Sequence, residues 1–192
     1  MKRIGKPGSE AIVVALAAAG MFLAGNGCDK SNPAAKTAAT KTMQPALPEI
    51  DPVRGHRNHA QPKLPTIKVW VGAEELITEI ASQPVQIATG MMFRTNMPEN
   101  TAMIFLFSQP GPKNFYMRNC VVPLSAGYIE PDGTLAEIIK LDPGDEAGVQ
   151  SKSSNIQFVL EVPQGWFERH NVRTGAVVRT ERGSLPATFL RR

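Results

Sequence analysis

The sequence predicts a mainly β protein: an antiparallel sandwich or jelly-roll-like distorted barrel with one or two short helices. Short apolar alternations run from residue 66 onward and are separated by turn residues, a pattern typical of antiparallel strands. The 16 Gly and 16 Pro among 192 residues interrupt long helices. With 42% hydrophobic residues, the chain can form one core of moderate size.

The domain begins with a predicted hairpin and a short helix. Apolar residues alternate over 67–71, and a second apolar run covers 76–81 after a Gly-Ala turn. Ser82 as the cap and Pro84 near the first helical position then begin a helix. We expect this helix to end at Gly90 or shortly after it, because glycine is common after the last helical turn.

Further strands follow this helix, and two of them are predicted to pair. Pro131-Asp132-Gly133 has the preset φ and the left-handed tolerance of a tight turn, so the runs on either side of it form a hairpin. One helical turn is expected over 165–171. The predicted strands are 103–107, 114–119, 125–129, 135–141, 157–162 and 176–180.

Residues 1–27 have the three parts of a bacterial export signal. Basic residues come first, an apolar run over 11–24 follows, and small residues precede Cys28. The apolar run is shorter than the roughly 20 residues that a membrane-spanning helix needs, so a retained transmembrane helix is the weaker alternative.

Cys28 is the predicted lipidation site. Gly25-Asn26-Gly27-Cys28 resembles the cleavage motif of bacterial lipoproteins, although Gly25 stands where leucine is usual. Cys28 and Cys120 are the two cysteines of the chain, and a disulfide between them would organise nothing. The alternative is ordinary signal cleavage near an incidental cysteine. We therefore expect a protein of the cell envelope that is attached to a membrane through a lipid.

Residues 28–64 are rich in Ala, Pro, Thr and Lys, and the sequence predicts a disordered tether. A protein beginning at Pro65 should accordingly keep its melting temperature. The predicted domain covers 65–182, and 183–192 is a tail. The domain has ten Lys and Arg against thirteen Asp and Glu, and this balance argues against nucleic-acid binding.

Five short motifs follow one another across residues 67–182. They are Gly90-Met91-Met92-Phe93-Arg94, Ala102-Met103-Ile104-Phe105, Phe115-Tyr116-Met117-Arg118-Asn119, Pro123-Leu124, and Phe158-Val159-Leu160-Glu161 with Gly165 after it. Their order and spacing resemble the uncharacterised prokaryotic family called domain of unknown function 192. The resemblance implies a compact, mainly antiparallel β sandwich or jelly-roll-like barrel, and it implies no settled activity.

The chain departs from the family pattern at several positions. Ser125 stands where the family usually has aspartate, and Cys120 where it usually has threonine. Arg118 replaces the usual lysine and Ala102 the usual glycine. If the family's aspartate were a catalytic acid or a metal ligand, this chain would lack that role.

Polar residues within the apolar motifs form the candidate site. Burying Arg94, Asn119, Ser125 or Glu161 without a partner is unfavourable by several kcal/mol. One interpretation is structural, with an Arg94–Glu161 ion pair across the β core and Asn119 fixing a loop. The other places these four residues and Met117 around a pocket for a small polar ligand.

Two other chemistries are alternatives. Thioether and thiol ligands would suit Cu(I), yet methionine also fills β cores. A Cys120–His170 pair would suit nucleophilic catalysis, but the family's threonine at position 120 argues against it. The sulfur residues concerned are Met91, Met92, Met97, Met103, Met117 and Cys120.

The predicted function is a non-catalytic envelope module that binds a small polar ligand or a protein partner. The alternative is an enzyme acting on an envelope polymer or sugar at the same surface. The sequence has no glycine-rich phosphate loop and no Ser-His-Asp pattern, and we predict no metal and no cofactor.

Overall fold

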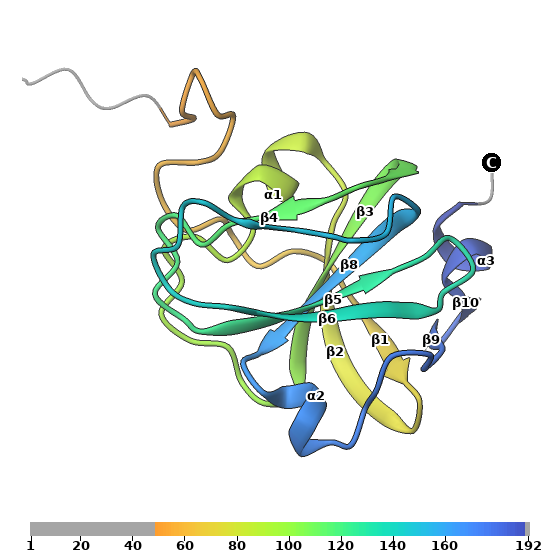
Figure 1. Cartoon of the computed structure of the whole chain (residues 1–192). Coiled ribbons are helices and arrows are strands. Elements are labelled where there is room, and N and C mark those ends of the chain that lie inside the picture. Colours follow the sequence, from red (N-terminus) through yellow and green to blue (C-terminus); the bar gives the residue numbers. More distant parts are fainter. Residues whose placement is uncertain (1–48, 191–192) are drawn as a thin grey trace, which may run out of the picture. The chain divides into compact units, whose positions relative to one another are not determined.

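The computed structural model describes residues 49–190, which form a mainly β domain (Figure 1). The predicted export signal and Cys28 lie outside the described residues. The strands of the described part are β1 (Thr66–Val71), β2 (Glu74–Ala81), β3 (Thr101–Gly111), β4 (Asn114–Phe115), β5 (Leu124–Ile129), β6 (Leu135–Leu141), β7 (Val149–Gln150), β8 (Ile156–Pro163), β9 (Val178–Thr180) and β10 (Gly183–Ser184). Its helices are α1 (Pro84–Thr89), α2 (Trp166–Arg169) and α3 (Leu185–Phe189).

Eight strands form one mixed sheet in the order β10-β9-β1-β2-β3-β8-β5-β6, and β4 pairs separately with β7. β2 and β3 are parallel because α1 carries the chain across between them, whereas the other neighbours are antiparallel. The two ends of the sheet approach each other, since Thr134 forms an isolated bridge with Val177. The predicted mainly β class is confirmed, as an open sheet that curls toward a barrel.

The predicted hairpin between β5 and β6 is confirmed, and Gly133 explains its turn. Gly133 has a φ of 97°, and a Cβ atom there would lie 2.9 Å from the carbonyl oxygen of Val178. The Gly133 carbonyl also accepts a hydrogen bond of 2.9 Å from the Val178 amide. Glycine is required both for this backbone conformation and for the close approach of the segment at β9.

The two faces of the sheet are covered by separate hydrophobic clusters because side chains alternate along each strand. The first cluster joins residues of β1, β2 and β8 to Trp166 of α2 and Leu185 of α3. The second joins residues of β3 and β5 to Met92, Met117 and Cys120 from connecting segments. The second cluster positions the candidate site.

The predicted helix after β2 is confirmed as α1, with Pro84 in its first turn and Gly90 at its C-cap. Its N-cap is Gln83 rather than the expected Ser82. The Gln86 side chain accepts hydrogen bonds from both the Ser82 and Gln83 amides, at 3.1 and 2.9 Å. The Gln86 side chain thus reaches back to the amides of the N-cap residue and the residue before it, and no serine cap is needed.

The chain before β1 packs on the domain, and here the structure differs from the predicted tether over 28–64. We call residues 56–64 the strap. His56, Gln61 and Leu64 in it are 3%, 4% and 8% exposed. Leu64 belongs to the second hydrophobic cluster. The tether prediction therefore does not hold for the strap.

The strap is held mainly by hydrogen bonds to α1. Gln61 Nε2 donates to the carbonyls of Gln86 and Gly90, at 3.2 and 2.8 Å. The Arg57 amide donates to Thr89 Oγ1 at 3.0 Å. The Gln86 carbonyl also accepts a hydrogen bond from the Gly90 amide, whereas the carbonyl of the C-cap residue Gly90 has no donor within the helix, so the strap supplies one to it. Composition alone could not reveal this, because apart from Leu64 these contacts use backbone and amide groups rather than apolar side chains.

A protein beginning at Pro65 is expected to melt roughly 10 °C below one beginning at Glu49. Burial of Leu64 contributes about 1.5 to 3 kcal/mol, and each hydrogen bond of the strap about 1 kcal/mol. Thermal unfolding of the two proteins followed by circular dichroism measures the difference. Equal melting temperatures would show that the strap contributes nothing to stability.

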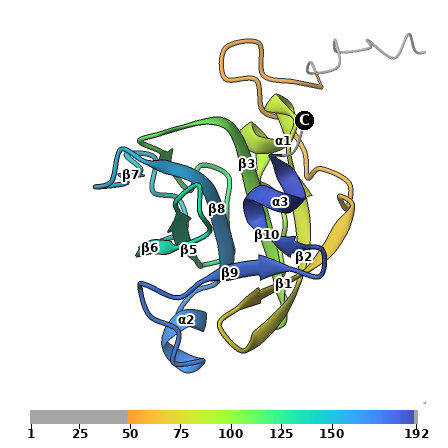
Figure 2. The same ribbon diagram turned by 90° about the vertical axis from the view of Figure 1, so that its right-hand side faces the viewer.

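The predicted tail over 183–192 also differs from the structure. β10 pairs with β9, and Figure 2 shows α3 beside β10. Leu185 is fully buried, and Phe189 packs against the first cluster. Ser184 caps α3 by accepting a hydrogen bond from the Ala187 amide at 3.3 Å. Serine followed two residues later by proline is a helix-start signal that the sequence does contain.

Candidate functional site

A cavity of about 170 Å³ is lined by members of the second hydrophobic cluster. Its walls come from α1 and the turn after it, from β3, and from β4 and the segment that follows it, with one residue of β8. Among the described residues, Glu161 is the only Asp, Glu, Lys, Arg or His side chain on the wall. Most other lining side chains are apolar or aromatic, including Met91, Met92, Phe105, Phe107 and Phe115.

Glu161 lies on an interior strand of the sheet. It lies on β8, paired with Met103 of β3 on one side and with Ala126 of β5 on the other. Met103 is also the partner of Glu79 on β2. Glu79, Met103 and Glu161 therefore form one row across three strands, in which the backbones of the two glutamates lie roughly 10 Å apart.

Glu161 is a buried acid without a described partner. Its side chain is 4% exposed, and its Oε2 accepts no hydrogen bond from the residues that the structure describes. Burial raises the pKa of Glu161 to about 8, although the positive charge of Arg94 opposes the increase. At neutral pH the Glu161 carboxyl group is therefore mostly protonated.

Arg94 pairs with Glu79, so the predicted Arg94–Glu161 ion pair is wrong. The two guanidinium nitrogens of Arg94 donate to the two Glu79 oxygens at 2.7 and 2.8 Å. The Leu64 amide donates to the same carboxylate at 2.7 Å. Burial by itself raises the pKa of Glu79, but the hydrogen bonds from Arg94 and Leu64 outweigh this effect and hold the pKa below its usual value.

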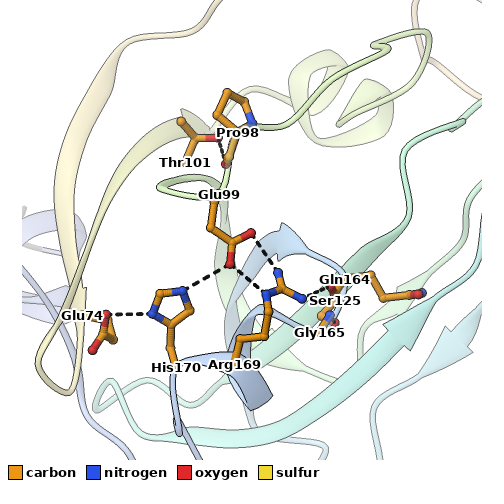
Figure 3. Close-up of polar contacts among 9 residues, drawn as sticks. All are labelled: Glu74, Pro98, Glu99, Thr101, Ser125, Gln164, Gly165, Arg169 and His170. Carbon is orange, nitrogen blue, oxygen red and sulfur yellow. Dashed lines mark hydrogen bonds and ion pairs between the residues drawn. The ribbon is translucent and has the colours of Figure 1, made fainter. Parts of the chain in front are cut away.

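The other predicted site residues have separate places. Ser125 is fully buried, and its Oγ accepts a hydrogen bond of 3.0 Å from the Gly165 amide, which fixes the start of α2 (Figure 3). Met117 is a core residue of the second cluster. Asn119 is exposed, with a φ of 55°.

The structure therefore does not bring the five predicted residues together. Glu161 lines the cavity. Arg94 lines a second hollow of about 160 Å³, in which Met91 is shared with the first. The two glutamates of the row thus face different hollows on one side of the sheet.

Cys120 lies on the cavity wall, with Met91 and Met92 as further sulfur residues. Burial, and the nearby Glu161, raise the pKa of the Cys120 thiol to about 12. At neutral pH this cysteine is a neutral thiol and not a nucleophilic thiolate. The proposed catalytic partner His170 instead hydrogen-bonds to carboxylates elsewhere in the domain.

Sequence reasoning missed two features of the site. Glu79 is the single acid in the apolar run over 76–81, so the rule that selected polar residues inside apolar motifs would have found it. Phe107 and Tyr116 line the cavity, but ordinary core packing explains aromatic residues in strands equally well. No pattern along the chain distinguishes an aromatic wall from an aromatic core.

A second polar cluster joins α2 to the β1–β2 hairpin and to the loop before β3 (Figure 3). The His170 ring lies between Glu74 and Glu99, with nitrogen–oxygen distances of 2.9 and 3.2 Å. Arg169 donates to both oxygens of Glu99 at 3.0 and 2.8 Å. These groups are partly exposed, and the cluster serves to tie three segments together.

Within residues 49–190, no group of three or more His, Cys, Asp or Glu side chains is arranged to hold a metal ion. The same residues include no helix with the length and apolar character needed to cross a membrane. The methionines considered for copper lie in three places. Met91 and Met92 are on the cavity wall, Met97 lines the second hollow, and Met103 and Met117 are fully buried core residues.

Fold and site together define a β domain with a small cavity that carries one buried acid. The chain belongs to the DUF192 family, described as "Uncharacterized ACR, COG1430", whose family model matches residues 67–180. The family resemblance predicted from the motifs is thereby confirmed. No curated protein matches the chain.

Two crystal structures are similar to this chain. One is a "putative transcription regulator" from Sinorhizobium meliloti 1021, with 28% identity and a TM-score of 0.59, covering 63% of this chain and 98% of that one. The other is a protein of unknown function from Novosphingobium aromaticivorans DSM 12444, with 29% identity and a TM-score of 0.58, covering 70% of this chain and 93% of that one. These likenesses support the fold and the family.

Proposed function

We propose that the protein is an exported envelope protein whose β domain binds a small polar ligand in the cavity at Glu161. In this proposal a lipid on Cys28 attaches the protein to a membrane, and the domain acts by binding rather than by catalysis. The leader over 1–27 and the cysteine that follows it support the envelope location. The cavity supports the binding role.

The unpartnered Oε2 of Glu161 is the observation that carries the binding proposal. A buried polar atom without a partner is unfavourable by about 1 to 3 kcal/mol, and a ligand that donates a hydrogen bond would remove this penalty. Engineered cavities of about 150 Å³ accommodate benzene. The cavity of about 170 Å³ therefore suits a ligand with an apolar body of roughly that size and one polar group.

An enzyme is the second candidate function, and the pKa of about 8 at Glu161 is the observation that favours it. A carboxyl group with a pKa near neutrality can act as a general acid or base. A general acid also needs a substrate that reaches it, and the Glu161 side chain is only 4% exposed. The neutral Cys120 thiol supplies no nucleophile at neutral pH. Binding is therefore the better-supported proposal.

Binding is tested with benzyl alcohol as the probe and the methyl groups of Met91 and Met92 as reporters, because both residues line the cavity. We expect millimolar benzyl alcohol to shift both methyl resonances in an NMR titration. Ala88→Trp, which places a large ring at a lining position of α1, should abolish the shifts. Val85→Trp on the same helix is the matched control, since Val85 does not line the cavity, and it should leave them intact.

The location is tested separately. The mature protein should partition into detergent, and Cys28→Ala should release it from membranes or leave its leader unprocessed. A soluble mature protein beginning at a residue other than Cys28 would rule out the lipid anchor, without affecting the binding proposal.

A further inference from the structure

The buried carboxyl group of Glu161 lacks a positive partner among the described side chains near it. Arg94 is the nearby cation that affects its pKa, but both terminal guanidinium nitrogens of Arg94 already bind Glu79. Lys113 donates to the carbonyl of Gln109 at 3.3 Å. A charged Glu161 would thus be left unpaired, which is why burial raises its pKa.

The cavity wall is rich in aromatic rings arranged edge to face. The centroids of Phe105 and Phe115 are 5.0 Å apart at an interplanar angle of 83°, and those of Phe107 and Phe115 are 6.4 Å apart at 81°. Aromatic faces carry partial negative charge and attract ammonium groups. Phe107 shows this attraction directly, because the Lys113 ammonium lies 4.5 Å above its ring centre.

We propose that the ligand of this cavity is a small organic cation with an ammonium group, which pairs with the Glu161 carboxylate while its apolar body packs among Phe105, Phe107 and Phe115. This inference rests on the proposed binding function and specifies its ligand class. The Glu161 carboxylate would supply the counter-charge for the ammonium group. The aromatic rings would supply a polarizable apolar surface for the apolar body of the ligand.

Binding of a cation also requires Glu161 to lose its proton. The titratable and charged groups that act on Glu161 or feel its charge are Arg94 after α1, Cys120 after β4, and Tyr128 on β5. Burial raises the pKa of both the thiol and the phenol, so these two stay neutral below pH 8. Cation binding at pH 7 should therefore release close to one proton, from Glu161, and affinity should rise between pH 6 and pH 8.

Calorimetric titration of the full-length protein in detergent micelles tests this inference with three probes of similar size and different charge: benzylammonium, benzyl alcohol and benzoate. At pH 8 we expect benzylammonium to bind at least about tenfold more tightly than benzyl alcohol, and benzoate to bind weakest. At pH 7, titrations in buffers of different ionisation enthalpy should show release of close to one proton for benzylammonium and none for the alcohol.

Glu161→Gln keeps the size of the side chain and removes its charge. In this variant the preference for benzylammonium should fall to within about twofold, and proton release should disappear. Glu168→Gln, which removes an exposed carboxylate of α2 outside the cavity, is the matched control and should behave like the wild type.

The outcomes separate the inference from the function on which it rests. If benzyl alcohol or benzoate binds the wild type as tightly as benzylammonium, the cation inference is wrong while the binding proposal stands. An unchanged preference in Glu161→Gln would also overturn the inference. If none of the three probes binds and none shifts the Met91 and Met92 methyl resonances, the binding proposal itself fails.

Discussion

Replacing Glu161 with glutamine is expected to abolish most of the pH dependence of stability between pH 5 and pH 8. The folded-state pKa of about 8 lies above the usual value of 4.5, so the folded protein retains a proton that the unfolded chain loses in this range. The retained proton on Glu161 contributes its full stabilisation to the folded state below about pH 4.5, and this contribution is lost as the pH rises to 8. A tenfold change in proton affinity corresponds to about 1.4 kcal/mol, so the wild type should lose roughly 4 kcal/mol between pH 5 and 8.

Urea unfolding at a series of pH values measures this loss. The free energy of unfolding of Glu161→Gln should be nearly constant from pH 5 to 8, and at pH 8 it should exceed that of the wild type. The comparison is specific because, among described residues with shifted pKa values, the other acids Asp51 and Glu79 have lowered values and titrate below this range. A variant that keeps the full slope would show that Glu161 is not the group responsible.

Arg94→Met is expected to destabilise the protein by about 2 to 4 kcal/mol. Removing one partner of a buried ion pair leaves the other charge uncompensated, at a penalty of about 3 to 5 kcal/mol, and the remaining exposure of 17% and 14% for Arg94 and Glu79 reduces this figure. Methionine preserves the apolar part of the arginine side chain. Chemical unfolding at pH 5, where Glu161 is neutral in the folded protein, measures the difference in the free energy of unfolding between the wild type and Arg94→Met.

Second-site changes identify the partner. Arg94→Met combined with Glu79→Gln should recover more than half of the lost stability, because the charge is removed and the amide oxygen can still accept the Leu64 amide. Arg94→Met combined with Glu161→Gln should recover none of it at pH 5. The opposite ranking of the two double variants would restore the Arg94–Glu161 pair that the sequence suggested.

Strand positions followed from the sequence because their signals are local. Alternation located β1, β6 and β8 to within one residue at each end, and Pro131-Asp132-Gly133 predicted the β5–β6 pairing. The identification of Glu161 as an unusual buried acid also followed from its apolar neighbours. Each of these conclusions depends on residues close together in the chain.

The sequence alone could not identify the partner of Arg94, because that partner depends on how strands distant in the chain pair with one another. Glu79 and Glu161 both lie one strand away from Met103, and only the parallel register of β2 on β3 places Glu79 beside Arg94. The strap was missed for a related reason. Its contacts through Gln61 and Arg57 are made by amide and backbone groups, which leave no hydrophobic pattern.

The strap connects the cavity wall to the part of the chain that precedes β1. A pulling force on the chain before the strap would act on the Gln61 and Arg57 hydrogen bonds before it acted on β1, because the strap precedes the sheet in the chain. Those bonds hold Thr89 and Gly90, which are themselves part of the cavity wall. Detaching the strap would free this wall without breaking any strand pair of the large sheet. If the cavity binds a ligand as proposed, a pulling force would therefore change the rate of its release before it unfolded the domain.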